Sequence, residues 1–493
     1  MNYRDEFQKL VDDNKLEDAR LLLEKYKYHA LDDAFYYSNM GWLCNHMENF
    51  QEAELFLRKG ILYFPDDGWL HAQLGYSLDH QNLIKEGLEC HLKALDLGYD
   101  EPWLQAEIGW CHKQLNEHGK AIQYFENALL EDDRNVWVLS QAAGSYFEMG
   151  DHETALEYYK KSYQILPDDD GLLDLIQVYR NLEMYEDEIH CLLLLKDENL
   201  KDYKEYELGL AYYYLGSYEE ALPHLLHVLE QGRDETRIHC VLGDVYLNLQ
   251  DKSKSDLHFN KALSYYEKAL EREMDQYWIY QEMIWIVNKQ NNHVKKLEYL
   301  DQLTKLIEPD AWTYYHYATS YSELGNYEEC LKACEEFFKF DDDNVDILDI
   351  YAWSLCKSNQ YKKSIDILNQ RIERYGGSDW VFGELGWNYA YLKDYKKSFD
   401  YFDKAAKETP TSLYYAMAGW CTLYTNQLDL TEEYLTKALS LDPNDGWIYS
   451  LFGDLYELRK EYELALESYH KAILHGFNEQ WVLDAVNRLE KEI

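Results

Sequence analysis

The stretch WLQAEIGWCHKQLNEHGKAIQYFENA, from Trp103 to Ala128, decides the fold of this chain. In a unit that opens at residue 102, Gly109, Ala121 and Ala128 take positions eight, twenty and twenty-seven. Two helices whose axes cross at about 8–10 Å admit only small side chains at the crossing point. The stretch therefore predicts two helices, A and B, packed against each other as a hairpin.

The same small residues recur along nearly the whole chain with a period of about 34 residues. Position eight, for example, holds Gly41, Gly75, Gly109, Ala143, Gly209, Gly243, Ala318, Ala352, Gly386, Gly419 and Gly453. Counting the openings gives fourteen units, which begin near residues 1, 34, 68, 102, 136, 170, 202, 236, 277, 311, 345, 379, 412 and 446. A fixed period of this length indicates an array of stacked repeats rather than separate globular domains.

The fourteen tryptophans all fall on positions two and nine of this unit. Residues that are seven apart share one face of a helix of 3.6 residues per turn. The tryptophans therefore indicate one surface that is repeated along the array.

Two irregularities divide the array into segments. The unit at 170–201 is two residues short and lacks the small residues, and the unit that opens at 236 carries seven extra residues, which predict a longer helix B. We expect four segments: an N-terminal array over 1–201, two repeats with the extension over 202–276, a C-terminal array over 277–479 and a capping helix over 480–493. The cap has an apolar side with Trp481, Leu483, Val486 and Leu489 and a charged opposite side, as a terminal element needs.

Small residues at positions eight, twenty and twenty-seven, aromatic residues near four, eleven and twenty-four, and proline near thirty-two resemble the tetratricopeptide repeat. The segment from Gly453 to Ala472, GDLYELRKEYELALESYHKA, carries the same pattern. The resemblance covers nearly the whole chain. It implies an all-α, right-handed superhelical solenoid of about fourteen helix-turn-helix repeats, with positions two, five, six, nine, twelve and thirteen of helix A lining a concave groove.

The candidate binding residues follow from these positions. Position nine offers indole rings for apolar or cation–π contacts, and position six offers amides and carboxylates that can hydrogen-bond an extended peptide. The candidates are Trp42, Gln73, Glu107, Trp110, Gln141, Trp285, Trp353, Glu384, Trp387 and Trp420. The tryptophans at position two are interpreted as sealing the seams between repeats, whereas those at position nine either face the groove or belong to the core.

Composition limits the partners. There are 92 acidic residues against 48 lysines and arginines, a formal charge of -44, which opposes binding to nucleic acid or to an anionic membrane. A basic or extended segment of a protein is the partner that this charge favours, although a solvated acidic surface explains the charge equally well.

The sequence predicts a cytoplasmic protein with reduced cysteines. Its first residues are charged, it has no apolar run of membrane-spanning length, and its nine cysteines show no CxxC spacing. Abundant Tyr, Asn, Lys and Ile are typical of a bacterial, AT-rich genome.

No catalytic, nucleotide-binding or metal-binding motif is recognisable. Acidic runs such as Asp66-Asp67 and Asp168-Asp169-Asp170 stand just before A helices, where carboxylates cap free amides, and they lack the spacing of a calcium loop. We therefore expect no enzyme, no cofactor and no metal. Some members of this family bind the acidic C-terminal tails of heat-shock chaperones through a lysine at position five and an asparagine at position nine. This chain has Ser38 and Trp42 at those positions, so we do not expect that activity.

The sequence thus predicts a non-enzymatic scaffold that binds a protein or peptide in the concave groove. The alternative is a peptide-sensing regulator whose superhelix changes shape on ligand binding and so controls a separate partner. Solenoids are suited to either role because each repeat contacts only its neighbours.

Overall fold

The computed structural model describes residues 3–27, 33–272 and 276–492. This part of the chain is built from α-helices joined by short turns, and no β-strand occurs in it. The chain divides into two compact units, Met1–Phe259 and Asn260–Ile493, and the boundary lies within one long helix, α16. It falls inside the segment 202–276, where the sequence carries its seven-residue insertion.

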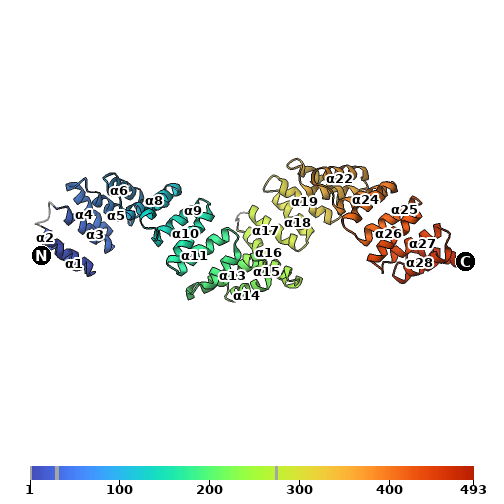
Figure 1. The fold of residues 1–493 in the computed structure, drawn as a ribbon, viewed down its shortest axis with the longest axis horizontal. Helices are drawn as coiled ribbons and strands as arrows, with labels where there is room; N and C mark the ends of the chain where they lie inside the picture. The colour runs from blue at the N-terminus through green and yellow to red at the C-terminus, as the bar shows by residue number, and fades with distance from the viewer. Residues whose placement is uncertain (1–2, 28–32, 273–275, 493) are drawn as a thin grey trace. The chain divides into compact units, whose positions relative to one another are not determined.

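The helices of the first unit follow one another in chain order (Figure 1). They are α1 (Tyr3–Asp12), α2 (Leu16–Tyr26), α3 (Ala34–His46), α4 (Phe50–Tyr63), α5 (Gly68–Asp79), α6 (Ile84–Asp96), α7 (Pro102–Gln114), α8 (His118–Glu131), α9 (Val136–Glu148), α10 (His152–Ile165), α11 (Asp169–Asn181), α12 (Tyr185–Leu194), the 3₁₀ helix η2 (Glu198–Leu200), α13 (Lys201–Leu215), α14 (Tyr218–Glu230), α15 (Thr236–Asn248) and the start of α16 (Lys252–Leu270).

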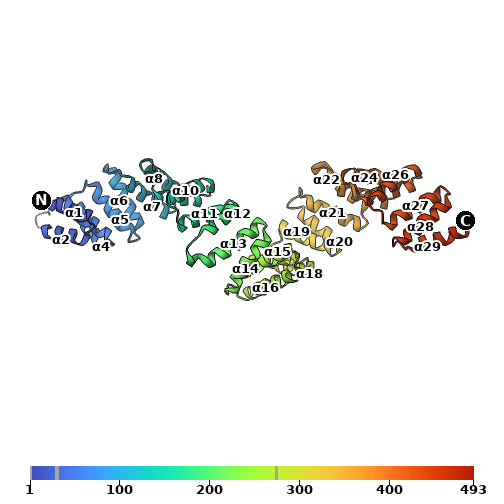
Figure 2. The same ribbon diagram turned by 60° about the horizontal axis from the view of Figure 1, so that its bottom comes forward.

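The second unit, coloured yellow to red in Figures 1 and 2, continues the same arrangement. After α16 come α17 (Gln276–Lys289), α18 (His293–Leu303), α19 (Ala311–Glu323), α20 (Tyr327–Phe337), α21 (Val345–Lys357), α22 (Tyr361–Tyr375), α23 (Asp379–Tyr391), α24 (Tyr395–Glu408), α25 (Ser412–Tyr424), α26 (Leu428–Leu441), α27 (Gly446–Leu458), α28 (Tyr462–Leu474) and α29 (Gln480–Glu492). The helices α1 to α28 form fourteen A/B pairs and α29 follows as the cap, so the predicted all-α repeat architecture is confirmed.

Helix pairing depends on the glycine at position eight. A Cβ atom added to Gly109 would lie 2.8 Å from the ring of Phe125, and one added to Gly386 would lie 2.9 Å from the ring of Phe402. In both repeats the ring belongs to position twenty-four of the same unit. The side chain of helix B therefore rests directly on the backbone of helix A, which explains why most repeats have glycine or alanine there.

Side-chain caps begin most A helices. The carboxylate of Asp67 accepts a hydrogen bond from the amide of Leu70, and that of Asp168 accepts one from Gly171. This confirms the capping interpretation of these two acidic runs. In α9 and α21 the cap is an asparagine instead, Asn135 or Asn344.

The turn from helix A to helix B has a feature that the sequence analysis missed. Position fifteen, or fourteen in the short repeat, adopts a left-handed backbone in every repeat, mostly as asparagine or glycine, from Asn14 to Lys460. At Asn82, for example, the amide bonds to the carbonyl of Asp79 and the next amide, of Leu83, bonds to that of Leu78. This Schellman pattern satisfies the last carbonyls of helix A and reverses the chain.

Both predicted irregularities are present. The helix α12 of the short repeat has 10 residues against 14 in α8, and α16 has 19. The last residues of the predicted extension, 273–275, lie outside the described residues. No helix of the described part combines the length and the apolar character needed to cross a membrane.

Candidate functional site

A helices of successive repeats contact one another in both units. Besides packing on its own B helix, α5 contacts α3 and α7, and α7 contacts α9; in the second unit α21 contacts α19 and α23, and α25 contacts α27. Apart from helices that follow each other directly in the chain, the helices that contact each other most are pairs of A helices. Positions on their shared face therefore come together from successive repeats, which makes this face the place to look for a binding site.

The six tryptophans at position nine are all partly exposed on the A helices. Five of them contact the residue four positions later on the same helix, which is the neighbour expected on a helix surface. The pairs are Trp42 with His46 (ring centres 3.9 Å apart), Trp285 with Lys289 (Nζ 5.3 Å from the ring centre), Trp353 with Lys357 (4.0 Å), Trp387 with Tyr391 (6.2 Å) and Trp420 with Tyr424 (5.0 Å). The faces of Trp285 and Trp353 therefore already carry a cation from their own helix.

Trp110, the sixth, packs at the edge of two apolar clusters, around Ile108 on one side and Leu139 on the other. Its environment is that of a half-buried packing residue with one open edge. Trp110 therefore belongs in part to the core and in part to the exposed surface, the two interpretations that the sequence left open for position nine.

Two of the four candidates at position six are engaged within the array. Asn45 donates a hydrogen bond to the side-chain oxygen of Gln73 over 3.2 Å, and Lys113 donates one to that of Gln141 over 2.9 Å. In both cases position twelve of one A helix reaches position six of the next. These amides therefore join successive repeats, and the spacing of 28 residues is the sequence signal for such a pair.

The other two, Glu107 and Glu384, are carboxyls in poorly solvated positions. Burial raises the pKa of Glu107 to about 8, and the nearby charge of Asp79 acts in the same direction. Burial raises the pKa of Glu384 to about 7, although Lys357 opposes this shift. Both groups therefore hold a proton more readily than an exposed glutamate does.

Tryptophans at position two contact the preceding B helix but remain open to solvent. The ring of Trp137 lies 6.5 Å from that of Phe125, and the ring of Trp481 lies 6.2 Å from that of Tyr469, in both cases edge to face. Each of these two indoles is 42% exposed. They cover the seam between repeats, as expected, and they also present a free face.

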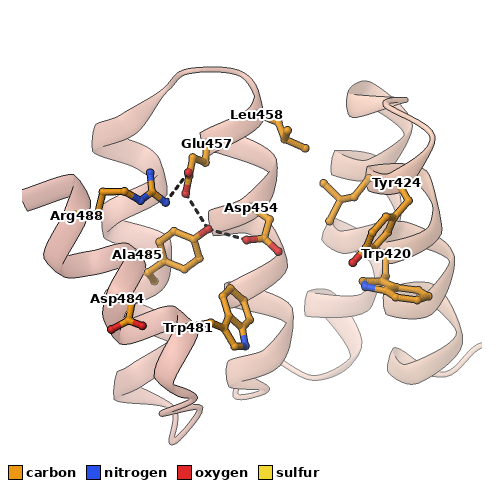
Figure 3. A pocket seen from close by; sticks show the side chains of 11 residues that line it. Trp420, Tyr424, Asp454, Glu457, Leu458, Trp481, Asp484, Ala485 and Arg488 are labelled. Atoms are coloured by element: carbon orange, nitrogen blue, oxygen red, sulfur yellow. Dashed lines mark hydrogen bonds and ion pairs between the residues drawn. The ribbon is translucent and has the colours of Figure 1, made fainter. Parts of the chain in front are cut away.

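One cleft on the A-helix layer is large enough to hold a side chain or a short peptide segment. It has a volume of about 840 Å³ and lies in the second unit, among α25, α27 and α29 (Figure 3). Its lining residues occupy positions nine, twelve and thirteen of α25 and α27, position twenty-four of α28, and one side of the cap: Trp420, Leu423, Tyr424, Asp454, Glu457, Leu458, Tyr469, Trp481, Asp484, Ala485 and Arg488.

A hydrogen-bonded chain crosses the floor of this cleft. The hydroxyl of Tyr469 donates to Asp454 Oδ1 over 2.7 Å and lies 3.2 Å from Glu457 Oε2, and Arg488 forms an ion pair with the other oxygen of Glu457 at 2.6 Å. Figure 3 shows these contacts as dashed lines. Burial raises the pKa of Asp454 to about 6, more than the bond from Tyr469 lowers it.

The cleft has more acidic than basic side chains, and aromatic rings lie on two of its sides. Three carboxyl groups, of Asp454, Glu457 and Asp484, face one guanidinium. Within the described part of the chain, only Glu457 of these three has an ion-pair partner. The rings of Trp420 and Tyr424 lie on one side and that of Trp481 on the other (Figure 3). This combination suits a cationic side chain, which interacts with both carboxylates and ring faces.

Of the ten predicted site residues, the cleft includes Trp420. The other nine lie on A helices elsewhere in the two units, where they stay candidates for a longer groove. Sequence reasoning missed Asp454, Glu457, Trp481 and Arg488. The available signal was Asp454 itself, an acid at position nine, where six other repeats have tryptophan.

Comparison with protein families supports the repeat pattern directly. One family model described as tetratricopeptide repeat matches residues 206–255, and a second model with the same description matches residues 104–135, 138–169, 313–344 and 413–445. The matches lie in both compact units.

Individual proteins and solved structures also match parts of this chain. The BBSome complex member BBS4 of Bos taurus is 28% identical over 152 residues, which are 31% of this chain and 28% of that protein, so the match spans less than a third of the relative. Among solved structures, the C-terminal part of a TPR repeat-containing protein from Cytophaga hutchinsonii is 13% identical, covers 51% of this chain and 99% of its own, and has a TM-score of 0.42. YrrB, described as a TPR protein with an unusual peptide-binding site, is 18% identical over 39% of this chain and 98% of its own, with a TM-score of 0.34.

Proposed function

Because the chain is a multi-repeat member of the tetratricopeptide-repeat family, we propose that it is a non-enzymatic scaffold that binds a segment of another protein along its layer of A helices. Repeats of this kind typically serve protein–protein interaction. The observation that supports a specific binding place is the cleft among α25, α27 and α29, with its three carboxyl groups and four aromatic rings.

The proposed ligand of the cleft is a lysine or arginine side chain in an extended segment. Asp454 and Asp484 supply negative charge, and Trp420 and Trp481 supply ring faces on opposite sides. A cation between such groups gains from both, and the gain increases where water is excluded. The overall charge of -44 attracts a basic segment from a distance.

A basic peptide tests this proposal. We expect a fluorescent peptide of alternating arginine and serine to bind the full chain with an affinity that falls as salt is raised. Trp420→Ala and the isosteric Asp454→Asn should each weaken binding about tenfold, which corresponds to about 1.4 kcal/mol. Fluorescence anisotropy gives the dissociation constants, and circular dichroism checks that the helices are intact.

The matched control is Asp366→Asn, which removes the same charge from an exposed position of α22. It should change the affinity by less than about twofold, because a single exposed charge is largely screened. If Asp366→Asn and Asp454→Asn weaken peptide binding equally, the peptide responds to the total charge of the chain, and the cleft is not the binding site. Binding that is indifferent to salt would also contradict the proposal.

A further inference from the structure

A buried group of three potential metal ligands lies in the first unit, far along the chain from the cleft. Asp79 is the last residue of α5, His91 belongs to α6 and Cys111 to α7. His91 Nε2 lies 2.8 Å from Asp79 Oδ2, and Cys111 Sγ lies 3.3 Å from the same oxygen. One donor atom from each side chain falls within 4.8 Å of the other two.

The three side chains are closed off from solvent: Asp79 is 5% exposed, and His91 and Cys111 are 0% exposed. Two polar atoms of this group, Asp79 Oδ1 and His91 Nδ1, have no hydrogen-bond partner among the residues that the structure describes. A buried polar atom without a partner costs free energy, so native proteins keep few of them without a reason. The unmet atoms are the first indication that a ligand belongs here.

The repeat pattern is altered around these residues in two places. His91 stands at position twenty-four, which holds an aromatic or aliphatic side chain in repeats such as those of Phe125 and Phe402. Gly87 stands at position twenty, where most other repeats have alanine, serine or cysteine; a Cβ atom there would collide with Asp79 Oδ1. Both exceptions occur in one repeat and both adjoin Asp79, so this repeat is adapted to hold the acid.

We propose that Asp79, His91 and Cys111 bind a Zn²⁺ ion. Oxygen, nitrogen and sulfur donors together are typical of zinc, whereas calcium and magnesium require oxygen ligands alone. Donor atoms around a tetrahedral zinc ion are about 3–4 Å apart. The 3.3 Å from Cys111 Sγ to Asp79 Oδ2 lies in this range, whereas the 2.8 Å from His91 Nε2 to the same oxygen must widen slightly when the ion enters. On binding, the thiol of Cys111 releases its proton to solvent, and neutral His91 coordinates through its unprotonated ring nitrogen while the other nitrogen keeps the single ring proton.

This site escaped the motif search because its ligands come from three helices. Asp79 and His91 are 12 residues apart, and Asp79 and Cys111 are 32 apart, so the short spacings of known zinc motifs do not occur. The ion would join α5 and α6 to the next A helix, α7. Its role is therefore to fasten one repeat to its neighbour, independently of the proposed peptide binding.

Metal content and cobalt spectroscopy test the proposal on the full chain. Since the site is closed to solvent, the protein is produced in medium supplemented with Zn²⁺ or Co²⁺ and then freed of loose metal by gel filtration. We expect one metal ion per chain. The cobalt form should show a thiolate-to-metal charge-transfer band in the near ultraviolet.

Cys111→Ser should abolish that band and reduce the retained metal at least tenfold, because the loss of a side chain that binds the metal directly costs no less than the loss of a group that only orients such a side chain. The fold should survive, since Ser77 and Ser145 occupy the same position of neighbouring repeats. The matched control is Cys421→Ser, which changes the buried cysteine at that position of a repeat without the acid and the histidine. It should keep both metal and band.

Two results would overturn the proposal. One is protein that retains less than about a tenth of an ion per chain from either medium. The other is metal retained equally by the wild type and by Cys111→Ser, because the thiol would then not be a ligand. Peptide binding in the cleft is measured on the same variants and should be unchanged by Cys111→Ser.

Discussion

At the scale of single residues, buried carboxyls on the A-helix layer couple stability to pH. Glu384 is 8% exposed, and its pKa rises from 4.5 to about 7 because burial penalises the charged form more than Lys357 favours it. Between these two pH values the folded state binds more protons than the unfolded state. Stability therefore decreases as the pH rises from about 4.5 through 7, and the full cost is present above that range.

We predict that Glu384→Gln removes this cost. The variant should gain stability relative to the wild type as the pH increases from about 5 to 8, by at most about 3 kcal/mol. Urea denaturation at several pH values measures the difference. Glutamine is suitable because Gln73 and Gln141 already occupy the same position in other repeats.

The control is Glu373→Gln at an exposed position of α22, which should leave the pH dependence unchanged. A stability difference between Glu384→Gln and the wild type that stays constant over this pH range would contradict the assigned pKa.

At the scale of elements, α29 determines how the array ends. Its buried side chains Val482, Val486 and Leu489 pack against Ala465 and Tyr469 of α28, and its other side is exposed. A helix with one apolar side can end a stack because it covers the last repeat and presents polar residues to water. The same helix contributes Trp481 and Arg488 to the cleft, so it also completes the candidate site.

We predict that Leu489→Ala loosens this end of the array. The residue is 0% exposed, and removing such a side chain costs about 2–5 kcal/mol. Because each repeat contacts only its neighbours, amide hydrogen exchange should accelerate in α27 to α29 and stay unchanged in α3 to α10. Exchange measured by mass spectrometry resolves the two regions.

Lys491→Ala, at an exposed position of the same helix, is the control and should leave exchange as in the wild type. Uniformly faster exchange along the whole chain in Leu489→Ala would mean that the array unfolds as a single cooperative body.

At the scale of the whole molecule, the two compact units meet within α16 instead of at a loop. This helix carries most of the insertion in the repeat pattern. A scaffold keeps its dimensions when a partner binds, whereas the alternative function, a peptide-sensing regulator, requires them to change.

We predict that saturating arginine–serine peptide leaves the radius of gyration of the full chain unchanged within about 3%, because a scaffold needs no difference in affinity between two shapes. Small-angle X-ray scattering with and without the peptide measures this. A larger change that disappears in Trp420→Ala would favour the regulator; the same change in both proteins would indicate a general effect of the basic peptide on an acidic chain.

The fold was predictable almost completely because its rules are local. The small residues at position eight lie where the expected helices cross, the openings counted from the sequence agree with the starts of the A helices, and Trp481 correctly indicated the cap. The left-handed turn residues were missed although asparagine or glycine marks most of them. Lys393 and Lys460 make the pattern harder to recognise, because lysine does not prefer the left-handed conformation that the turn requires there.

The sequence by itself determined the repeat, its length, its irregular units and the helices that carry the candidate binding residues. These properties depend on spacing along one or two helices, which a period of 34 residues records directly. Only the tertiary structure decided which side chains lie close together: Trp420 with Asp454 and Trp481, and Asp79 with His91 and Cys111. Such groups form where helices from successive repeats converge, and their distances depend on packing that no single helix specifies.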